Sequence, residues 1–168
     1  MNLPTFSTLT VALADGIAEV RLNRPDNANA MNDAMWQEIR QAFDWVGATP
    51  AARVAILAGE GRNLCAGIDL ALLAGIQQRI AHPDPARSRE ALRRLILDFQ
   101  DCLTAAERCR KPVVAAIQGA CIGGARDLLP ARDLRYAAHR APLPVAEADI
   151  GLVAQVRPWQ PVLYNTQA

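Results

Sequence analysis

Lysine is nearly absent from the sequence. Of its 18 basic residues 17 are arginine, Lys111 is the single lysine, and 17 acidic residues bring the net charge to +1. A chain so close to neutral has no overall field that would attract nucleic acid or an anionic membrane surface. Long hydrophobic runs are absent as well, since none approaches the ~20 residues of a membrane-spanning helix.

Metal-binding and disulfide patterns are also missing. The two histidines stand apart from the four cysteines, which show no Cys-x-x-Cys spacing: Cys65, Cys102, Cys109 and Cys121. We therefore expect buried or inert thiols and no metal site. The N-terminal residues lack the basic and then apolar pattern of a signal peptide, so a cytoplasmic location is expected.

Length and composition predict one domain. With 168 residues, 51% of them hydrophobic, the chain is able to bury one sizeable core. We assign this core to residues 1–156, because residues 157–168 show no hydrophobic period and form an atypical C-terminal tail.

Hydrophobic periodicity predicts an α/β chain of strands and helices in succession. Asp15-Gly16 is a strong signal for a tight turn between two strands. Asn32 or Asp33 is placed to cap a helix whose apolar residues recur at helical spacing. The expected elements are strands at 8–13, 17–22, 53–58 and 113–117, a helix from about 33 to 46, a helix at 86–108 and a helix after 124.

Two glycine-bearing segments about fifty residues apart, 64–70 and 119–127, carry the strongest functional signal. Each follows a predicted buried strand and precedes a stretch compatible with a helix, so backbone N–H groups are exposed where the helix begins. Two such turns brought together make an oxyanion hole. The alternative is that the glycines only relieve crowding where a strand meets a helix. Neither segment has the Lys-Ser/Thr pair of a nucleotide-phosphate loop.

Together with residues 21–25 and 111–116, these segments resemble the enoyl-CoA hydratase/isomerase (crotonase) family over residues 8–156. Residues 121–124, 133–136 and 145–152 are most similar to the dienoyl-CoA isomerase branch. The resemblance implies a spiral of ββα units, usually assembled into trimers or hexamers. It also implies that this chain lacks the family's C-terminal helical region and is an incomplete, truncated core.

The family's site residues transfer to this sequence by position. The resemblance implies that the backbone N–H groups of Ile68 and Gly124 form the oxyanion hole and that Asp127 and Glu147 are the catalytic acids. It implies no cofactor, with coenzyme A present only as part of the substrate. Residues expected to line the substrate path are Ala66, Gly67, Ile68, Asp69, Leu70 and Gly124, with Arg24 and Arg62 as candidates for contacts with the CoA phosphates.

Alternatives remain for each of these assignments. Asp127 also suits a helix start, and Glu147 an exposed loop; Asp69 and Asp133 resemble capping or structural groups. Gln155 stands where the dienoyl isomerases carry a third acid, and Pro130 falls within the expected last helix.

These assignments lead to two functional hypotheses. The first is enolate chemistry on an acyl-CoA thioester in fatty-acid degradation, either isomerisation of 3,5-dienoyl-CoA to 2,4-dienoyl-CoA or hydration of enoyl-CoA. The second is a non-catalytic acyl-CoA-binding protein or an inactive, truncated family member.

Overall fold

The computed structural model describes residues 2–127 and 134–138, with backbone only at 126–127 and 134–135. Its centre is a five-stranded sheet in the order β1-β2-β3-β4-β5, in which β1 and β2 are antiparallel and all other neighbours are parallel. The strands are β1 (Leu9–Ala14), β2 (Ile17–Leu22), β3 (Val54–Gly59), β4 (Val113–Ile117) and β5 (Leu134–Ala137).

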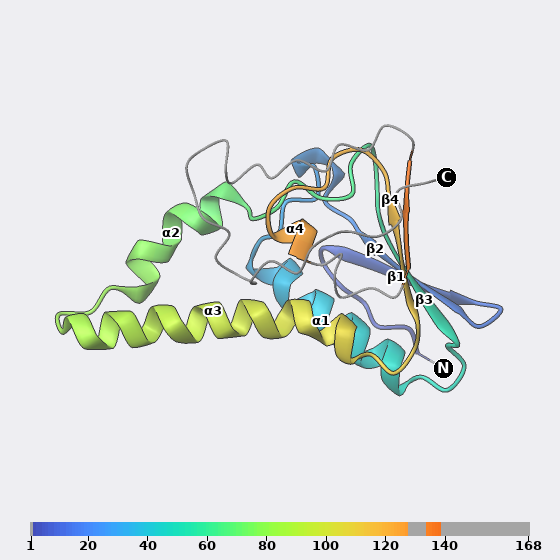
Figure 1. Cartoon of the computed structure of the whole chain (residues 1–168), viewed down its shortest axis with the longest axis horizontal. Helices are drawn as coiled ribbons and strands as arrows, with labels where there is room; N and C mark the ends of the chain where they lie inside the picture. The colour runs from blue at the N-terminus through green and yellow to red at the C-terminus, as the bar shows by residue number, and fades with distance from the viewer. Residues whose placement is uncertain (1, 128–133, 139–168) are drawn as a thin grey trace.

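Helices connect these strands and cover the sheet (Figure 1). The 3-10 helix η1 (Pro25–Asn27) and α1 (Asp33–Ala48) follow the hairpin, α2 (Leu70–Ile80) and α3 (Pro85–Arg108) join β3 to β4, and α4 (Gly124–Asp127) follows β4. α1 packs against the C-terminal part of α3 beside the sheet, whereas α2 and the start of α3 project from it as an arm. In the part of the chain that the structure describes, no helix is long and apolar enough to cross a membrane.

The predicted hairpin is confirmed at its turn. Asp15 has φ 51° and Gly16 has φ 84°, the two positive values that a type I′ turn requires. The carbonyl of Gly16 accepts a 2.7 Å hydrogen bond from the backbone N–H of Arg53. The turn therefore also anchors the start of β3 beside β2.

The predicted helix start at Asn32 is confirmed as well. Its side chain accepts a 2.9 Å hydrogen bond from the N–H of Met35 and so caps α1. The predicted apolar face of α1 is fully buried, and Trp36 stacks on Phe99 of α3 with ring centroids 4.6 Å apart. Since each aromatic ring buries a large apolar area, this stack is a main contact between the two helices.

Two features differ from the sequence prediction. The apolar residues of the predicted helix at 86–108 recur at helical spacing and are expected to be buried, but Leu92 and Ile96 are only half-buried, because the first part of α3 belongs to the projecting arm. The helix-compatible stretch expected after the first glycine segment is α2, whereas β5 extends the sheet beyond the predicted strands. The pairing of β5 with β4 is decided by contacts between distant parts of the chain, which local periodicity does not encode.

Glu38 fastens the start of β1 to α1. Its Oε1 accepts hydrogen bonds from the N–H of Ser7 at 2.8 Å and from the Ser7 hydroxyl at 2.7 Å, and its Oε2 accepts from the N–H of Thr8 at 2.8 Å and from the Thr8 hydroxyl. Partial burial acts to raise the pKa of Glu38, but these four donors outweigh it and hold the pKa below its ordinary value.

This lowered pKa predicts a loss of stability in acid. Because the carboxylate is favoured in the folded state, its contribution is fully present above the unfolded pKa of about 4.3 and is lost as the pH falls through the lower folded pKa. We expect Glu38→Gln to be less stable than the parent near neutral pH, with the difference shrinking in acid. Urea unfolding between neutral pH and pH of about 3 measures this, and an unchanged difference over that range would contradict it.

Candidate functional site

The two glycine segments lie side by side in the structure. They extend the parallel pairing of β3 and β4, with Cys65 opposite Cys121. The N–H of Cys65 donates to the carbonyl of Ala120 at 3.1 Å, and the N–H of Ile122 donates to the carbonyl of Cys65 at 3.1 Å. Backbone hydrogen bonds therefore set the register between the two turns.

Gly67 is packed closely against the second turn. It has φ 92°, and a Cβ atom there would lie 2.8 Å from the carbonyl oxygen of Ile122 and 3.5 Å from the Cα of Gly123. Both the positive φ and the crowding require glycine. The alternative that glycine relieves crowding is thus true of this position, and the crowding arises from contact with the other turn.

The direction of the Ile68 N–H follows from its neighbours. The N–H of Met31 donates to the carbonyl of Gly67 at 2.7 Å, and the N–H of Asp69 donates to the carbonyl of Met31 at 3.0 Å. In a trans peptide the N–H points opposite to the preceding C=O, so the Ile68 N–H points away from Met31. Among the described residues it has no backbone acceptor.

The second turn presents Gly124 at the start of α4. The N–H of Ala125 donates to the carbonyl of Ile122 at 3.2 Å, which closes a turn around Gly123 at φ 56° and Gly124. A Cβ on Gly124 would lie 3.1 Å from Met31 Cε and 3.3 Å from Trp36 Cη2. Gly124 is therefore packed directly onto the core, which fixes its backbone.

Asp69 and Arg24 form an ion pair beneath the first turn. Arg24 Nη1 lies 2.9 Å from Asp69 Oδ2 and also donates to the carbonyl of Ala30. Asp69 Oδ1 accepts a 2.9 Å hydrogen bond from the N–H of Ala71 and caps α2. The hydrogen bond from Arg24, followed by that from Ala71, lowers the pKa of the Asp69 carboxyl. The structural role expected for Asp69 is confirmed.

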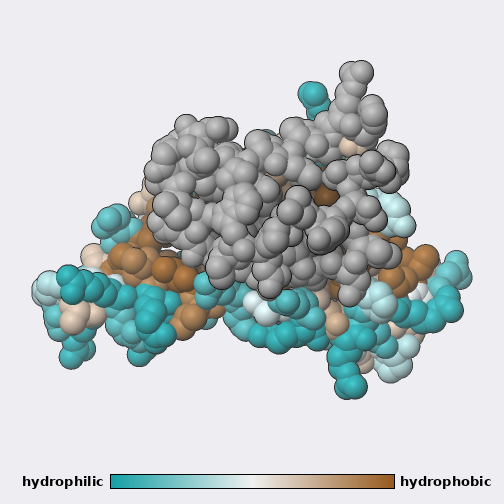
Figure 2. Space-filling model, in the orientation of Figure 1, coloured by the Kyte–Doolittle hydropathy of each residue, from teal (hydrophilic) through white to brown (hydrophobic). Residues whose placement is uncertain are grey.

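The remaining predicted residues divide by location. Ala66 and Leu70 are exposed, Leu70 to 79%, and apolar side chains gather over α2 beside this point (Figure 2).

Asp127 is the last residue of α4, and its side chain, like Glu147, Gln155 and Pro130, lies outside the described part. Arg62 is exposed, whereas Arg24 already holds Asp69; contacts of either with CoA stay predictions.

Sequence reasoning missed Asn29, which organises the loop leading into the first turn. Asn29 is fully buried with φ 55°. Its Nδ2 donates to the carbonyls of Glu60 and Asn63, both at 2.9 Å, and its Oδ1 accepts from the N–H of Arg24 at 2.8 Å. Asparagine tolerates the left-handed region better than most residues, but nothing in its local sequence reveals these partners.

Asn63 in turn joins this loop to the second turn. Its Oδ1 accepts a 3.0 Å hydrogen bond from the N–H of Ala120. A Cβ on Gly119 would lie 2.7 Å from the same oxygen and 2.1 Å from the carbonyl of Arg62. The loop before the first turn and the strand end before the second turn are thus locked together.

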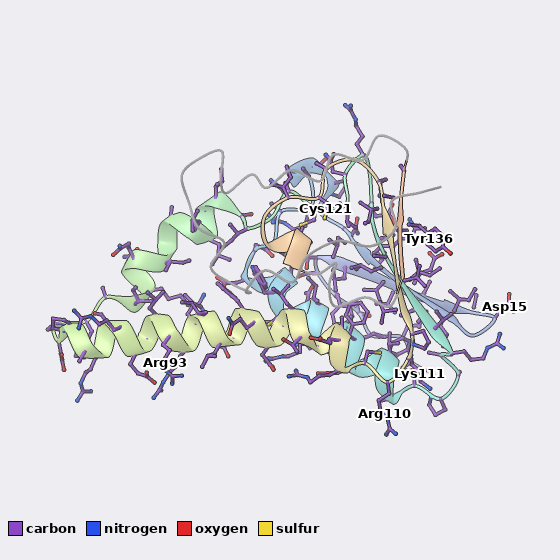
Figure 3. All side chains as sticks on the ribbon, in the orientation of Figure 1. Asp15, Arg93, Arg110, Lys111, Cys121 and Tyr136 are labelled. Atoms are coloured by element: carbon purple, nitrogen blue, oxygen red, sulfur yellow. The ribbon has the colours of Figure 1, made fainter. Side chains whose placement is uncertain are left out.

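Both thiols at the site, Cys65 and Cys121, are buried. Burial raises the pKa of the Cys65 thiol to about 12, although the Gly67 N–H acts in the opposite direction. Cys65 Sγ donates to the carbonyl of Asn29 at 2.9 Å. Cys121 lies at the turn above α1, far from the charged residues labelled on α3 and at the sheet's lower end (Figure 3). The described residues hold no cluster of three metal-ligating side chains.

Known proteins resemble this chain in sequence and in fold. Residues 13–162 match the family model described as enoyl-CoA hydratase/isomerase. The peroxisomal Delta(3,5)-Delta(2,4)-dienoyl-CoA isomerase of Arabidopsis thaliana is 38% identical over 160 residues, covering 93% of this chain and 58% of the relative. The human mitochondrial enzyme of the same name is 40% identical over 153 residues, covering 90% and 47%.

Solved structures share the fold. An enoyl-CoA hydratase from Shewanella pealeana superposes with a TM-score of 0.77 at 24% identity, covering 90% of this chain and 54% of that structure. The chain spans about half the length of these relatives. A family model that matches nearly the whole chain, relatives at about 40% identity and a common crotonase-like fold lead to one conclusion: this chain belongs to the enoyl-CoA hydratase/isomerase family.

Proposed function

We propose that this chain polarises the carbonyl of an acyl-CoA thioester, and that the N–H groups of Ile68 and Gly124 are the two donors. The observation that carries the proposal is the contact of Gly67 with Ile122 and Gly123, which brings the two turns together. Neither donor carries a formal charge, and both are held by backbone hydrogen bonds or core packing before any substrate arrives. Such preorganised donors stabilise an enolate oxygen far better than water does.

In the proposed reaction, Glu147 removes and returns the proton at C2 of the thioester. The negative charge that develops on the thioester oxygen is stabilised by the two N–H groups, while Asp127 polarises or orients the reacting group. The chemistry requires carboxylates whose pKa is tuned in a site that excludes water. The location of Asp127 three residues after Gly124, at the end of α4, supports its part in this scheme.

Glu147→Gln tests the proton-transfer step. We expect exchange of the C2 proton with solvent deuterium to fall by about 100-fold or more, because an amide is not a base at neutral pH. Binding of the CoA ester is expected to change little. Asp149→Asn, a similar loss of charge two residues away, serves as the control. Mass spectrometry of the recovered ester measures the exchange in both variants. Equal exchange in Glu147→Gln and the parent would remove Glu147 from this role.

Isomerisation of a 3,5-dienoyl-CoA and hydration of an enoyl-CoA are two outcomes of the same enolate chemistry. The relatives named dienoyl-CoA isomerases support the first. Gln155, which offers no acid for the far end of a diene, supports the second, in which Asp127 and Glu147 share an attacking water. Incubation with each substrate and separation of the products distinguishes a shifted diene from a hydroxyacyl-CoA.

A non-catalytic acyl-CoA-binding role is the second candidate function. It is favoured by Gln155 and Pro130, two departures from the family pattern in the part expected to carry the acids. Thermal stabilisation by CoA esters with no exchange at C2 would support it. Assembly into trimers or hexamers and a cytoplasmic location stay predictions, which sedimentation and microscopy of the tagged chain address.

A further inference from the structure

Met31 contacts both glycine turns at once. Its backbone N–H and C=O hold Gly67 and Asp69, the two residues that flank Ile68. Its side chain reaches the other way, so that Met31 Cε lies 3.1 Å from the position of a Cβ on Gly124. One fully buried residue therefore touches the backbone on both sides of the proposed site.

The support beneath Gly124 is shared with Trp36. The three atoms nearest to a Cβ on Gly124 are Met31 Cε, Trp36 Cη2 and Trp36 Cζ2. The indole is held by its stack on Phe99, and its buried Nε1 has no hydrogen-bond partner among residues 2–127 and 134–138. Since Met31 and Trp36 support Gly124 by side-chain packing, a change in side-chain shape there is transmitted to Gly124. Figure 1 shows α4 directly above the start of α1.

An oxyanion hole works only if its two donors keep a fixed separation, to within about 0.5 Å. The two turns arise from segments more than fifty residues apart, so this separation depends on whatever packs against both. We propose that Met31 is the positioning residue of the oxyanion hole. Its backbone orients the Ile68 N–H, and its thioether methyl fixes the position of the Gly124 backbone, so that Met31 sets the separation between the two donors. This inference rests on the proposed function of the two donors.

The chemistry of methionine suits this task. Its unbranched side chain reaches Gly124 with the terminal methyl group Cε. Leucine has a similar volume, but it branches at Cγ and its methyl groups end one atom sooner, so it cannot put a methyl in the same place. Met31 is fully buried, so it acts through Gly124 and the first turn. Met35, also fully buried and on the first turn of α1, offers a matched control because it is not among the atoms nearest to Gly124.

The test compares Met31→Leu with Met35→Leu in the 168-residue chain. The probe is cinnamoyl-CoA, whose conjugated thioester absorbs at longer wavelength when its carbonyl is polarised. We expect Met31→Leu to reduce the red shift of bound cinnamoyl-CoA by about half or more, and to move the Gly124 amide resonance, while the affinity for free CoA changes by less than about twofold. Met35→Leu is expected to leave all three readouts as in the parent.

The outcomes separate the inference from the proposed function. A parent chain that fails to bind cinnamoyl-CoA, or binds it without a red shift, contradicts the proposed function, and the Gly124 resonance then decides the role of Met31. An unmoved Gly124 resonance in Met31→Leu, or equal movement in Met35→Leu, overturns the inference. If Met31→Leu does not fold, carbon-13 labelling of the methionine methyls in the parent replaces it: a nuclear Overhauser contact from the Met31 methyl to Gly124 supports the inference and its absence refutes it.

Discussion

Gly67→Ala is expected to lower exchange of the C2 proton of an acyl-CoA by about 100-fold or more, the scale seen when one oxyanion donor is lost. The added methyl would lie 2.8 Å from the carbonyl oxygen of Ile122, a backbone atom that cannot rotate aside. Gly67 also has φ 92°, which disfavours any side chain. The first turn must therefore move away from the second and take the Ile68 N–H with it.

The same substitution is expected to reduce the free energy of unfolding by roughly 2–4 kcal/mol, from the positive φ together with overpacking. Gly75→Ala is the matched control. A Cβ on Gly75, within α2, meets no atom of the described residues within 4 Å, and Gly75 has no positive φ, so the change is expected to be neutral or to stabilise by up to about 1 kcal/mol.

For both variants, mass spectrometry measures the exchange of the C2 proton for deuterium, and urea unfolding measures the free energy of unfolding. Parental exchange in a folded Gly67→Ala would show that the close approach of the turns is unrelated to the chemistry. A large loss of stability in Gly75→Ala would show instead that the method reports a general sensitivity to the substitution.

Asn29→Ala is expected to give the largest loss of stability, about 3–4 kcal/mol. The change removes three hydrogen bonds in a fully buried loop and leaves the Arg24 N–H without its acceptor, and the carbonyls of Glu60 and Asn63 without their donor. Alanine is also less tolerant than asparagine of φ 55°.

The control is Asn27→Ala, because Asn27 is exposed on η1 and its side chain makes no hydrogen bond within the described residues. Its effect is expected to stay within about 0.5 kcal/mol. Urea unfolding at neutral pH measures both variants. Similar losses in the two would mean that the buried network of Asn29 contributes little beyond its local backbone.

Where signals are local, the sequence alone is sufficient. The turn at Asp15-Gly16, the cap at Asn32 and the two glycine turns were predictable because positive φ, capping and the end of a strand each leave a mark within a few residues. The family resemblance then assigned donors to Ile68 and Gly124. Asp69 was correctly expected to be structural, although its partner was not foreseen.

The tertiary structure decided every contact between distant segments. Arg24 pairs with Asp69, 45 residues away, Asn29 binds Asn63, 34 residues away, and Met31 lies under Gly124. Leu92 and Ile96, two apolar residues on one face of α3, are only half-buried because the start of α3 lies in the projecting arm. Local sequence determines which backbone shapes are allowed, but packing of the sheet against α1 selects which side chains meet, and therefore which residues hold the two donors together.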